Sequence, residues 1–76
     1  MTTTTINLKT FGDVQEFVNT LTTFAFDIDL VSGRYIVDAK SIMGIYSLDL
    51  TKPIQLNAHT DDAEDLFAAI DKYIVK

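Results

Sequence analysis

The feature that most constrains the fold of this 76-residue chain is that its hydrophobic pattern changes period several times. Apolar and polar residues alternate over three segments, which predicts half-buried strands at 5–9, 26–30 and 53–58. A fourth strand is predicted at 35–39, as the partner of 26–30 in a hairpin. Elsewhere the apolar residues recur every three or four positions, as on one face of a helix. The resulting order is strand, helix, strand, strand, short helix, strand, helix. It predicts a two-layer α+β sandwich with the helices on one side of the sheet.

An apolar stripe predicts the first helix: Val14, Phe17, Val18, Leu21 and Ala25. Thr10 stands where an N-cap is needed, and Asp13 can bond back to it from the first turn. A second stripe predicts the last helix: Leu66, Phe67, Ile70, Tyr73 and Ile74. Asp61 and Glu64 have the spacing of a capping box before it, and Lys72 and Lys76 lie where the helix dipole favours cations.

Turn and cap residues organise the middle of the chain. Ser32-Gly33-Arg34 predicts a tight turn between two strands. Ser41 is placed as the N-cap of a short apolar helix over residues 41–48, in which Ile45 is the expected core residue. Gly44 costs about 1 kcal/mol relative to Ala inside a helix, so it indicates close approach to a neighbouring element. Pro53 then begins the last strand.

Composition excludes several classes of function. The chain has no Cys and one His, so neither a thiolate zinc site nor a thiol nucleophile is available. Its net charge of −5 argues against binding nucleic acid or an anionic membrane surface. No window holds the ~20 apolar residues of a membrane span, and the start has no features of a targeting segment. We expect one domain, residues 1–76, in the cytoplasm, with no metal ion and no cofactor.

The segment Asp38-Ala39-Lys40-Ser41-Ile42-Met43-Gly44-Ile45-Tyr46-Ser47-Leu48 resembles the signature of the HPr family. HPr is the histidine-containing phosphocarrier of the bacterial sugar phosphotransferase system. In that family, Lys-Ser-Ile-Met-Gly followed by Ser-Leu marks a regulatory serine and its short helix. The resemblance implies an open-faced sandwich of four antiparallel strands and three helices, which agrees with the pattern above. It also implies a phosphoryl carrier rather than a stand-alone enzyme.

The chain departs from the family pattern at the start of the first helix. The family has Gly-(Ile or Leu)-His-Ala-Arg-Pro there, in which the histidine carries the phosphoryl group and the arginine assists it. This chain has Lys9-Thr10-Phe11-Gly12-Asp13. Counting back from the serine motif without gaps puts Thr10 at the histidine position and Gly12 at the arginine position. A threonine hydroxyl is a far poorer phosphoryl acceptor than an imidazole unless a base assists it. We therefore expect the phosphohistidine relay to be lost.

The remaining histidine, His59, follows the strand over residues 53–58. That strand should run antiparallel to the first strand, so His59 should lie at the opposite edge of the sheet from Thr10. We interpret it as a solvated side chain between a strand and a helix cap rather than as a substitute phosphoryl acceptor. The acidic residues are interpreted as a solvated face, with Asp27 and Asp29 pointing to water.

Two features of the short helix have a structural and a functional interpretation. Ser41 is either a plain N-cap or, in addition, the site of an HPr-type serine kinase. Some apolar residues of the helix are either buried or part of an exposed contact surface beside Ser41: Ile42, Met43, Tyr46 and Leu48. Together with Lys40, they are the expected partner-binding residues.

The leading hypothesis is a non-catalytic HPr-like module that binds proteins through the 41–48 helix and the start of the first helix. Phosphorylation of Ser41 would regulate this binding. Its partners would be proteins of the phosphotransferase system, sugar-pathway enzymes or transcriptional regulators. Two alternatives remain: a diverged phosphocarrier that still accepts a phosphoryl group, and a structural or dimerising module that kept only the fold. The sequence does not fix the oligomeric state.

Overall fold

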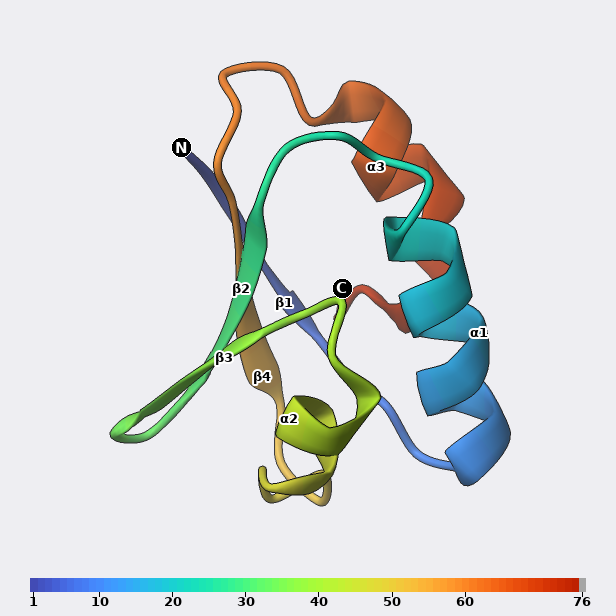
Figure 1. Cartoon of the computed structure of the whole chain (residues 1–76), viewed down its shortest axis with the longest axis vertical. Helices are drawn as coiled ribbons and strands as arrows, with labels where there is room; N and C mark the ends of the chain where they lie inside the picture. The colour runs from blue at the N-terminus through green and yellow to red at the C-terminus, as the bar shows by residue number, and fades with distance from the viewer. Residues whose placement is uncertain (76) are drawn as a thin grey trace.

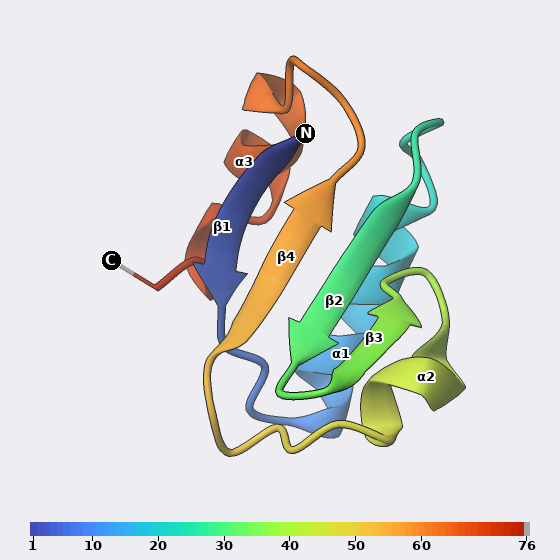
Figure 2. The same cartoon turned by 90° about the vertical axis from the view of Figure 1, so that its left-hand side faces the viewer.

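A computed structural model, which describes residues 1–75, has one four-stranded antiparallel sheet. Its strands are β1 (Thr2–Ile6), β2 (Ile28–Ser32), β3 (Tyr35–Asp38) and β4 (Ile54–Ala58). They lie in the order β1-β4-β2-β3, so β1 and β3 are the edges (Figure 2). Every neighbouring pair is antiparallel, as the alternating pattern and the family resemblance predicted.

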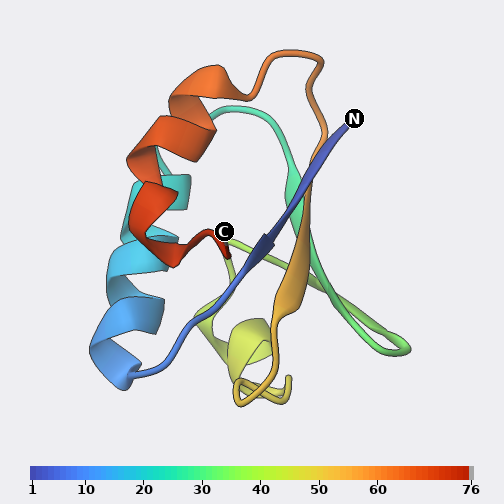
Figure 3. The ribbon, with the colours of Figure 1, turned by 180° about the vertical axis from the view of Figure 1, so that it is seen from behind.

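All helices cover one face of this sheet, and the other face is open (Figures 1 and 3). They are α1 (Phe11–Leu21), α2 (Ile42–Tyr46) and α3 (Glu64–Ala69), and a 3₁₀ turn, Asp71–Tyr73, follows α3. The predicted element order and two-layer sandwich are therefore confirmed. No helix among residues 1–75 is both long enough and apolar enough to cross a membrane.

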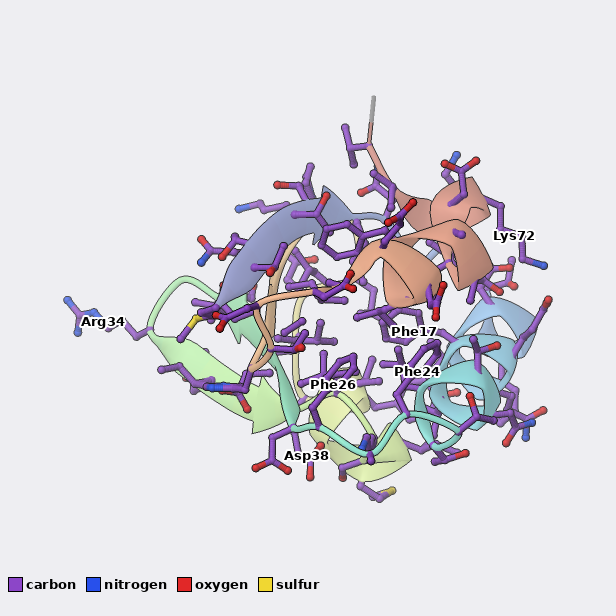
Figure 4. The ribbon with its side chains drawn as sticks, turned by 90° about the horizontal axis from the view of Figure 1, so that it is seen from above. Phe17, Phe24, Phe26, Arg34, Asp38 and Lys72 are labelled. Carbon is purple, nitrogen blue, oxygen red and sulfur yellow. The ribbon has the colours of Figure 1, made fainter. Side chains whose placement is uncertain are left out.

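The core lies between the sheet and the helices. The predicted inward residues of β4 and the stripe of α1 are buried there: Ile54, Leu56, Ala58, Val14, Phe17, Val18 and Leu21. Figure 4 looks along this layer and shows Phe17, Phe24 and Phe26 within it, whereas Arg34 projects from the hairpin tip. Phe17 meets Tyr73 edge to face at a centroid distance of 5.7 Å, which joins α1 to the end of the chain.

The first two strands and the first helix differ from prediction at their boundaries. β1 uses the threonine run and ends at Ile6, because Thr2–Ile6 pairs residue by residue with β4; Leu8 is buried beyond the strand. β2 begins only at Ile28, although Phe26 still packs against the core. α1 ends at Leu21, so Ala25 is exposed and is not part of the helix stripe. The hydroxyls of Thr22 and Thr23 bond back to carbonyls of the last helical turn.

The predicted capping box of the last helix is wrong. α3 begins at Glu64 with Ala63 as its N-cap and no side-chain cap, and Asp62 accepts a hydrogen bond from the Glu64 N–H at 3.1 Å. The predicted stripe also does not form one continuous helix, because the end of the chain returns to β1. Ile74 pairs with Ile6, and the Val75 N–H donates to the Thr5 carbonyl at 2.8 Å. The predicted role of Lys76 falls outside the described residues.

Candidate functional site

Ser41 is the N-cap of α2, as predicted. Its Oγ accepts a hydrogen bond from the Gly44 N–H at 3.1 Å, which satisfies one of the free donors of the first turn. The predicted close approach of a neighbouring element to Gly44 is also present. A Cβ at this position would lie 3.3 Å from both Ser41 Oγ and Val37 Cβ, so α2 packs directly on β3 here.

Thr10 is the N-cap of α1 and forms a complete reciprocal cap with Asp13. Thr10 Oγ1 accepts from the Asp13 N–H at 3.0 Å. Asp13 Oδ2 accepts from the Thr10 N–H at 3.3 Å and from the Lys9 N–H at 3.1 Å. The prediction of this cap is confirmed, with Asp in place of the more usual Glu or Gln. The cap places the Asp13 carboxylate against the backbone N–H groups of Lys9 and Thr10.

The start of α1 and the end of α2 meet through a pair of aromatic rings. Phe11 stacks on Tyr46 with a centroid distance of 5.5 Å and an interplanar angle of 23°. Phe11 is 63% exposed, Tyr46 is 37% exposed and Met43 is 78% exposed. We call these three residues, with the half-buried Ile42, the α1–α2 surface. Ser41 caps the helix that carries most of it.

The predicted docking region includes the start of the first helix but does not single out Phe11. Phe11 is three positions before Val14 and seven before Val18, so it lines up with one edge of the apolar stripe, yet it is 63% exposed. A large aromatic residue that stays exposed in the first turn of a helix is a candidate contact residue. Pattern alone does not show that its neighbour is Tyr46, 35 positions further along the chain (46 − 11).

The expectation that Leu48 joins an exposed surface is wrong, because Leu48 is only 7% exposed. The chain leaves α2 in a tight turn in which the Leu48 N–H donates to the Ile45 carbonyl at 3.0 Å. This turn directs Leu48 into the core beside the fully buried Ile45. Ile42 is intermediate, since it is half-buried and packs against the core.

The family model described as "PTS HPr component phosphorylation site" matches residues 13–76 of this chain. A crystal structure of HPr-C-His from Thermoanaerobacter tengcongensis superposes with a TM-score of 0.79 at 32% identity and covers 95% of this chain and 89% of that one. This chain belongs to the HPr family. A Mycoplasma histidine-containing phosphocarrier protein shares the HPr fold, with a TM-score of 0.71 at 18% identity over 93% of this chain and 86% of that one. No curated protein matches by sequence.

The family match begins at Asp13, so Thr10 precedes it and the serine motif falls inside it. HPr proteins are phosphocarriers, which agrees with the expectation that this chain is not a stand-alone enzyme. Within residues 1–75, no cluster of three or more His, Cys, Asp or Glu side chains has the geometry to hold a metal ion.

Lys40 precedes Ser41, but its ammonium group points to the segment that follows α1. Its Nζ donates to the Phe24 carbonyl at 2.7 Å and to the Phe26 carbonyl at 3.0 Å. Lys40 therefore ties the segment after α1 to the segment before α2. Its predicted contact with a partner protein stays a prediction, and such a contact would compete with these two hydrogen bonds.

His59 lies at the end of the sheet remote from Thr10, as predicted. β4 runs antiparallel to β1, so Ile54 pairs with Ile6 near the start of α1, and His59 follows Ala58 at the other end. His59 is exposed, as expected, and its ring is not isolated, because Nε2 lies 2.6 Å from Asp29 Oδ2. Asp29 is half-buried and lies between the buried Ile28 and Leu30, so its side chain is on the opposite face of β2 from the core.

An ion pair joins α1 to the end of the chain. Lys72 Nζ pairs with Glu16 Oε1 on the exposed side of α1. The hydrogen bond from Lys72 lowers the pKa of Glu16 below its usual 4.5, and the same bond raises the pKa of Lys72 above 10.5. Burial raises the pKa of the neighbouring Tyr73 phenol. Glu16 and Lys72 are therefore both charged at neutral pH.

Proposed function

We propose that this member of the HPr family is a protein-binding regulatory module that carries no phosphoryl group on histidine. The observation that supports this proposal most directly is the geometry around Thr10. The gap-free count from the serine motif assigns Thr10 to the family's histidine position. Its hydroxyl accepts a hydrogen bond from the Asp13 N–H, and the Asp13 carboxylate accepts from the Lys9 and Thr10 N–H groups. A phosphoryl group approaching Thr10 would meet the negative charge of Asp13, and this carboxylate is held by two backbone N–H groups rather than by the hydroxyl.

His59 does not provide a substitute. A carrier histidine has to reach the active site of the donor protein at the same surface as the family's histidine. His59 lies at the far end of β4, and its Nε2 contacts Asp29 at 2.6 Å. The diverged-phosphocarrier alternative therefore has no suitable nucleophile near the start of α1.

The docking site in this proposal is the α1–α2 surface. Phe11 and Met43 are more than half exposed, and the ring stack of Phe11 on Tyr46 holds the two helices in a fixed relation. A pre-ordered apolar surface loses little conformational entropy on binding. The expected partner is a protein of the phosphotransferase system or a transcriptional regulator with an apolar recess for these side chains.

Ser41 is the regulatory residue in this proposal. Its Oγ lies at the first turn of α2, immediately before Ile42 and Met43 of the docking site. Phosphorylation would add about two negative charges there, together with three strong acceptor oxygens. The change would alter which partner proteins accept the α1–α2 surface without unfolding α2, because negative charge is favourable at a helix N-terminus.

An HPr-type serine kinase tests both parts of this proposal. We expect the kinase to phosphorylate the wild-type protein at Ser41 and to leave Ser41→Ala unmodified, as mapped by mass spectrometry. Met43→Asp should slow phosphorylation by roughly tenfold or more, because it puts a charge in a buried apolar contact. Tyr35→Asp is the matched control, since Tyr35 is 66% exposed but lies on β3. If Met43→Asp and Tyr35→Asp slow phosphorylation equally, the kinase does not dock on the α1–α2 surface. If Ser41 of the wild-type protein stays unmodified, it has no regulatory role.

A further inference from the structure

The free edge of the sheet at β3 carries features that the proposed function does not use. β3 is the last strand in the sheet order, with β2 on its only paired side among the described residues. Tyr35 is 66% exposed and Ile36 is 69% exposed, so β3 exposes an apolar side chain on each face of the sheet edge. An exposed strand edge with apolar side chains is a template for pairing with another strand.

The register determines which backbone groups face outward. The Ala39 N–H donates to the Ile28 carbonyl at 2.9 Å, so Ile28 and Ala39 are a hydrogen-bonded pair. Hydrogen-bonded and non-hydrogen-bonded pairs alternate in an antiparallel ladder. Val31 and Ile36 are therefore a non-hydrogen-bonded pair, as are Asp29 and Asp38. The N–H and C=O groups of Ile36 and Asp38 consequently point away from β2, toward the free edge.

The side chains along this edge are complementary to a second copy of themselves. In an antiparallel pairing centred on Ile36, each Ile36 faces Ile36 of the other copy, and each Arg34 faces Asp38 of the other copy. Arg34 projects from the hairpin tip (Figure 4) and forms no ion pair within residues 1–75. Asp38 uses one carboxylate oxygen for the Lys40 N–H at 2.8 Å. The arrangement gives one Arg34–Asp38 pair on each side of the central Ile36–Ile36 contact, two pairs in all.

The helix layer leaves this edge accessible. α2 packs against β3 from the inner side, where Gly44 lies against Val37. Figure 1 shows α2 on the helix side of the hairpin, and Figure 2 shows that α2 projects past the free edge of β3. A second β3 strand would therefore add in the plane of the sheet, in front of α2 as seen in Figure 2.

We propose that two copies of this chain associate through β3, antiparallel about a two-fold axis at Ile36, to form one continuous sheet. The central pair exchanges two backbone hydrogen bonds, and the Arg34–Asp38 pairs fix the register. A short edge of this kind supports a weak, concentration-dependent dimer rather than an obligate one. This proposal is independent of histidine chemistry and of the α1–α2 surface, which lies on other elements.

Charge exchange tests the proposal with the full chain. We expect light scattering and analytical ultracentrifugation to show a monomer–dimer equilibrium between micromolar and millimolar concentration. Arg34→Glu and Asp38→Arg should each weaken the affinity of the dimer roughly tenfold. Each change replaces the two attractive Arg34–Asp38 pairs by two repulsive pairs. The double variant, which restores opposite charges, should regain most of the affinity. Thr23→Glu, on the exposed end of the α1 segment, is the control and should leave it unchanged.

The backbone gives a second readout that does not depend on the variants folding equally well. The Ile36 and Asp38 amides should exchange slowly with deuterium at high protein concentration and fast at low concentration, while the Val37 amide should not change. A protein that stays monomeric at millimolar concentration would overturn the proposal. A dimer in which the double variant fails to recover, or in which the Ile36 amide stays unprotected, would assign the interface to another surface.

Discussion

Phe11 and Tyr46 stack with their ring centroids 5.5 Å apart, and this contact joins the first turn of α1 to the last turn of α2. It holds Thr10, the N-cap of one helix, in a fixed relation to Ser41, the N-cap of the other. Two caps that are far apart in the sequence thereby belong to one surface.

The ring stack should be measurable as a coupling free energy. Aromatic pairs of this kind contribute about 0.5–1.5 kcal/mol beyond the area they bury, with the lower end expected at an exposed site. A double-mutant cycle of Phe11→Ala and Tyr46→Ala, followed by urea denaturation, should therefore give a non-additivity of about 0.5 kcal/mol. Strictly additive effects would show that the rings are neighbours without a net attraction.

The cap at Ser41 should stabilise the fold by about 1 kcal/mol relative to Ala, because the Gly44 N–H loses its acceptor in Ser41→Ala. Ser41→Asp keeps an acceptor at this position and adds a negative charge at the helix N-terminus, so it should retain most of that stability. Chemical denaturation of the two variants tests the cap. If Ser41→Asp is as unstable as Ser41→Ala, the hydrogen bond to Gly44 is not what holds the turn.

Truncation of Leu48 should destabilise the fold, whereas truncation of Met43 should have little effect on stability. Leu48→Ala removes a side chain that is 7% exposed and should cost about 2–5 kcal/mol in the free energy of unfolding. Met43→Ala truncates a side chain that is 78% exposed and should change stability by less than about 0.5 kcal/mol. Thermal or urea unfolding of both variants measures the contrast. Similar losses for the two would contradict the burial pattern of α2.

Lys40 should be a stabilising residue because its ammonium donates to the carbonyls of Phe24 and Phe26. Lys40→Met keeps the apolar stem and removes both charged hydrogen bonds, at an expected cost of about 1.5–3 kcal/mol. Lys40→Arg, which can still donate, is the control and should lose less. Hydrogen exchange in the segment between α1 and β2 should also become faster in Lys40→Met. Unchanged exchange there would mean that Lys40 does not anchor this segment.

The Glu16–Lys72 pair should give a stability difference that depends on pH. Glu16 has a lowered pKa in the folded state, so its contribution is present above about pH 4.5 and is lost as the pH falls through the folded value. Lys72 has a raised pKa, so its contribution is present below about pH 10.5 and is lost as the pH rises through the folded value.

The stability of the wild-type protein minus that of Glu16→Gln should therefore be largest near neutral pH and should vanish at both extremes. Because the pair is exposed, the difference should be small and should shrink in high salt. Denaturation curves over a pH series measure it. A difference that persists at low pH would have to come from packing rather than from charge.

The sequence predicts the sheet and the caps of α1 and α2 better than it predicts α3 and the segment that follows it. Alternation in 53–58 and the stripe from Val14 to Leu21 directly reflect which side chains are buried, so these elements were predictable. The end of the chain was not, because its conformation depends on a distant partner. Tyr73 and Ile74 lie beside Asn7 and Ile6, and no local pattern encodes that pairing.

The candidate site divides in the same way. The cap at Ser41 follows from local sequence and was anticipated. The exposure of Met43 was one of two open interpretations, and the structure decides between them. The burial of Leu48 depends on the turn after α2, and the stacking of Phe11 on Tyr46 depends on the approach of two helices. The hydrogen bonds of Lys40 join segments 14 and 16 positions apart. Contacts of this kind require the fold before they can be predicted.

The most direct test of the central claim is to incubate the protein with phosphoenolpyruvate and the general phosphotransferase enzymes and to map any phosphate by mass spectrometry. Authentic histidine-containing HPr serves as the positive control. The account predicts no acid-labile phosphate on His59 and no phosphate on Thr10, while Ser41 remains available to a serine kinase. Stoichiometric phosphorylation of His59 or Thr10 in this reaction would contradict it and would make the chain a working phosphocarrier.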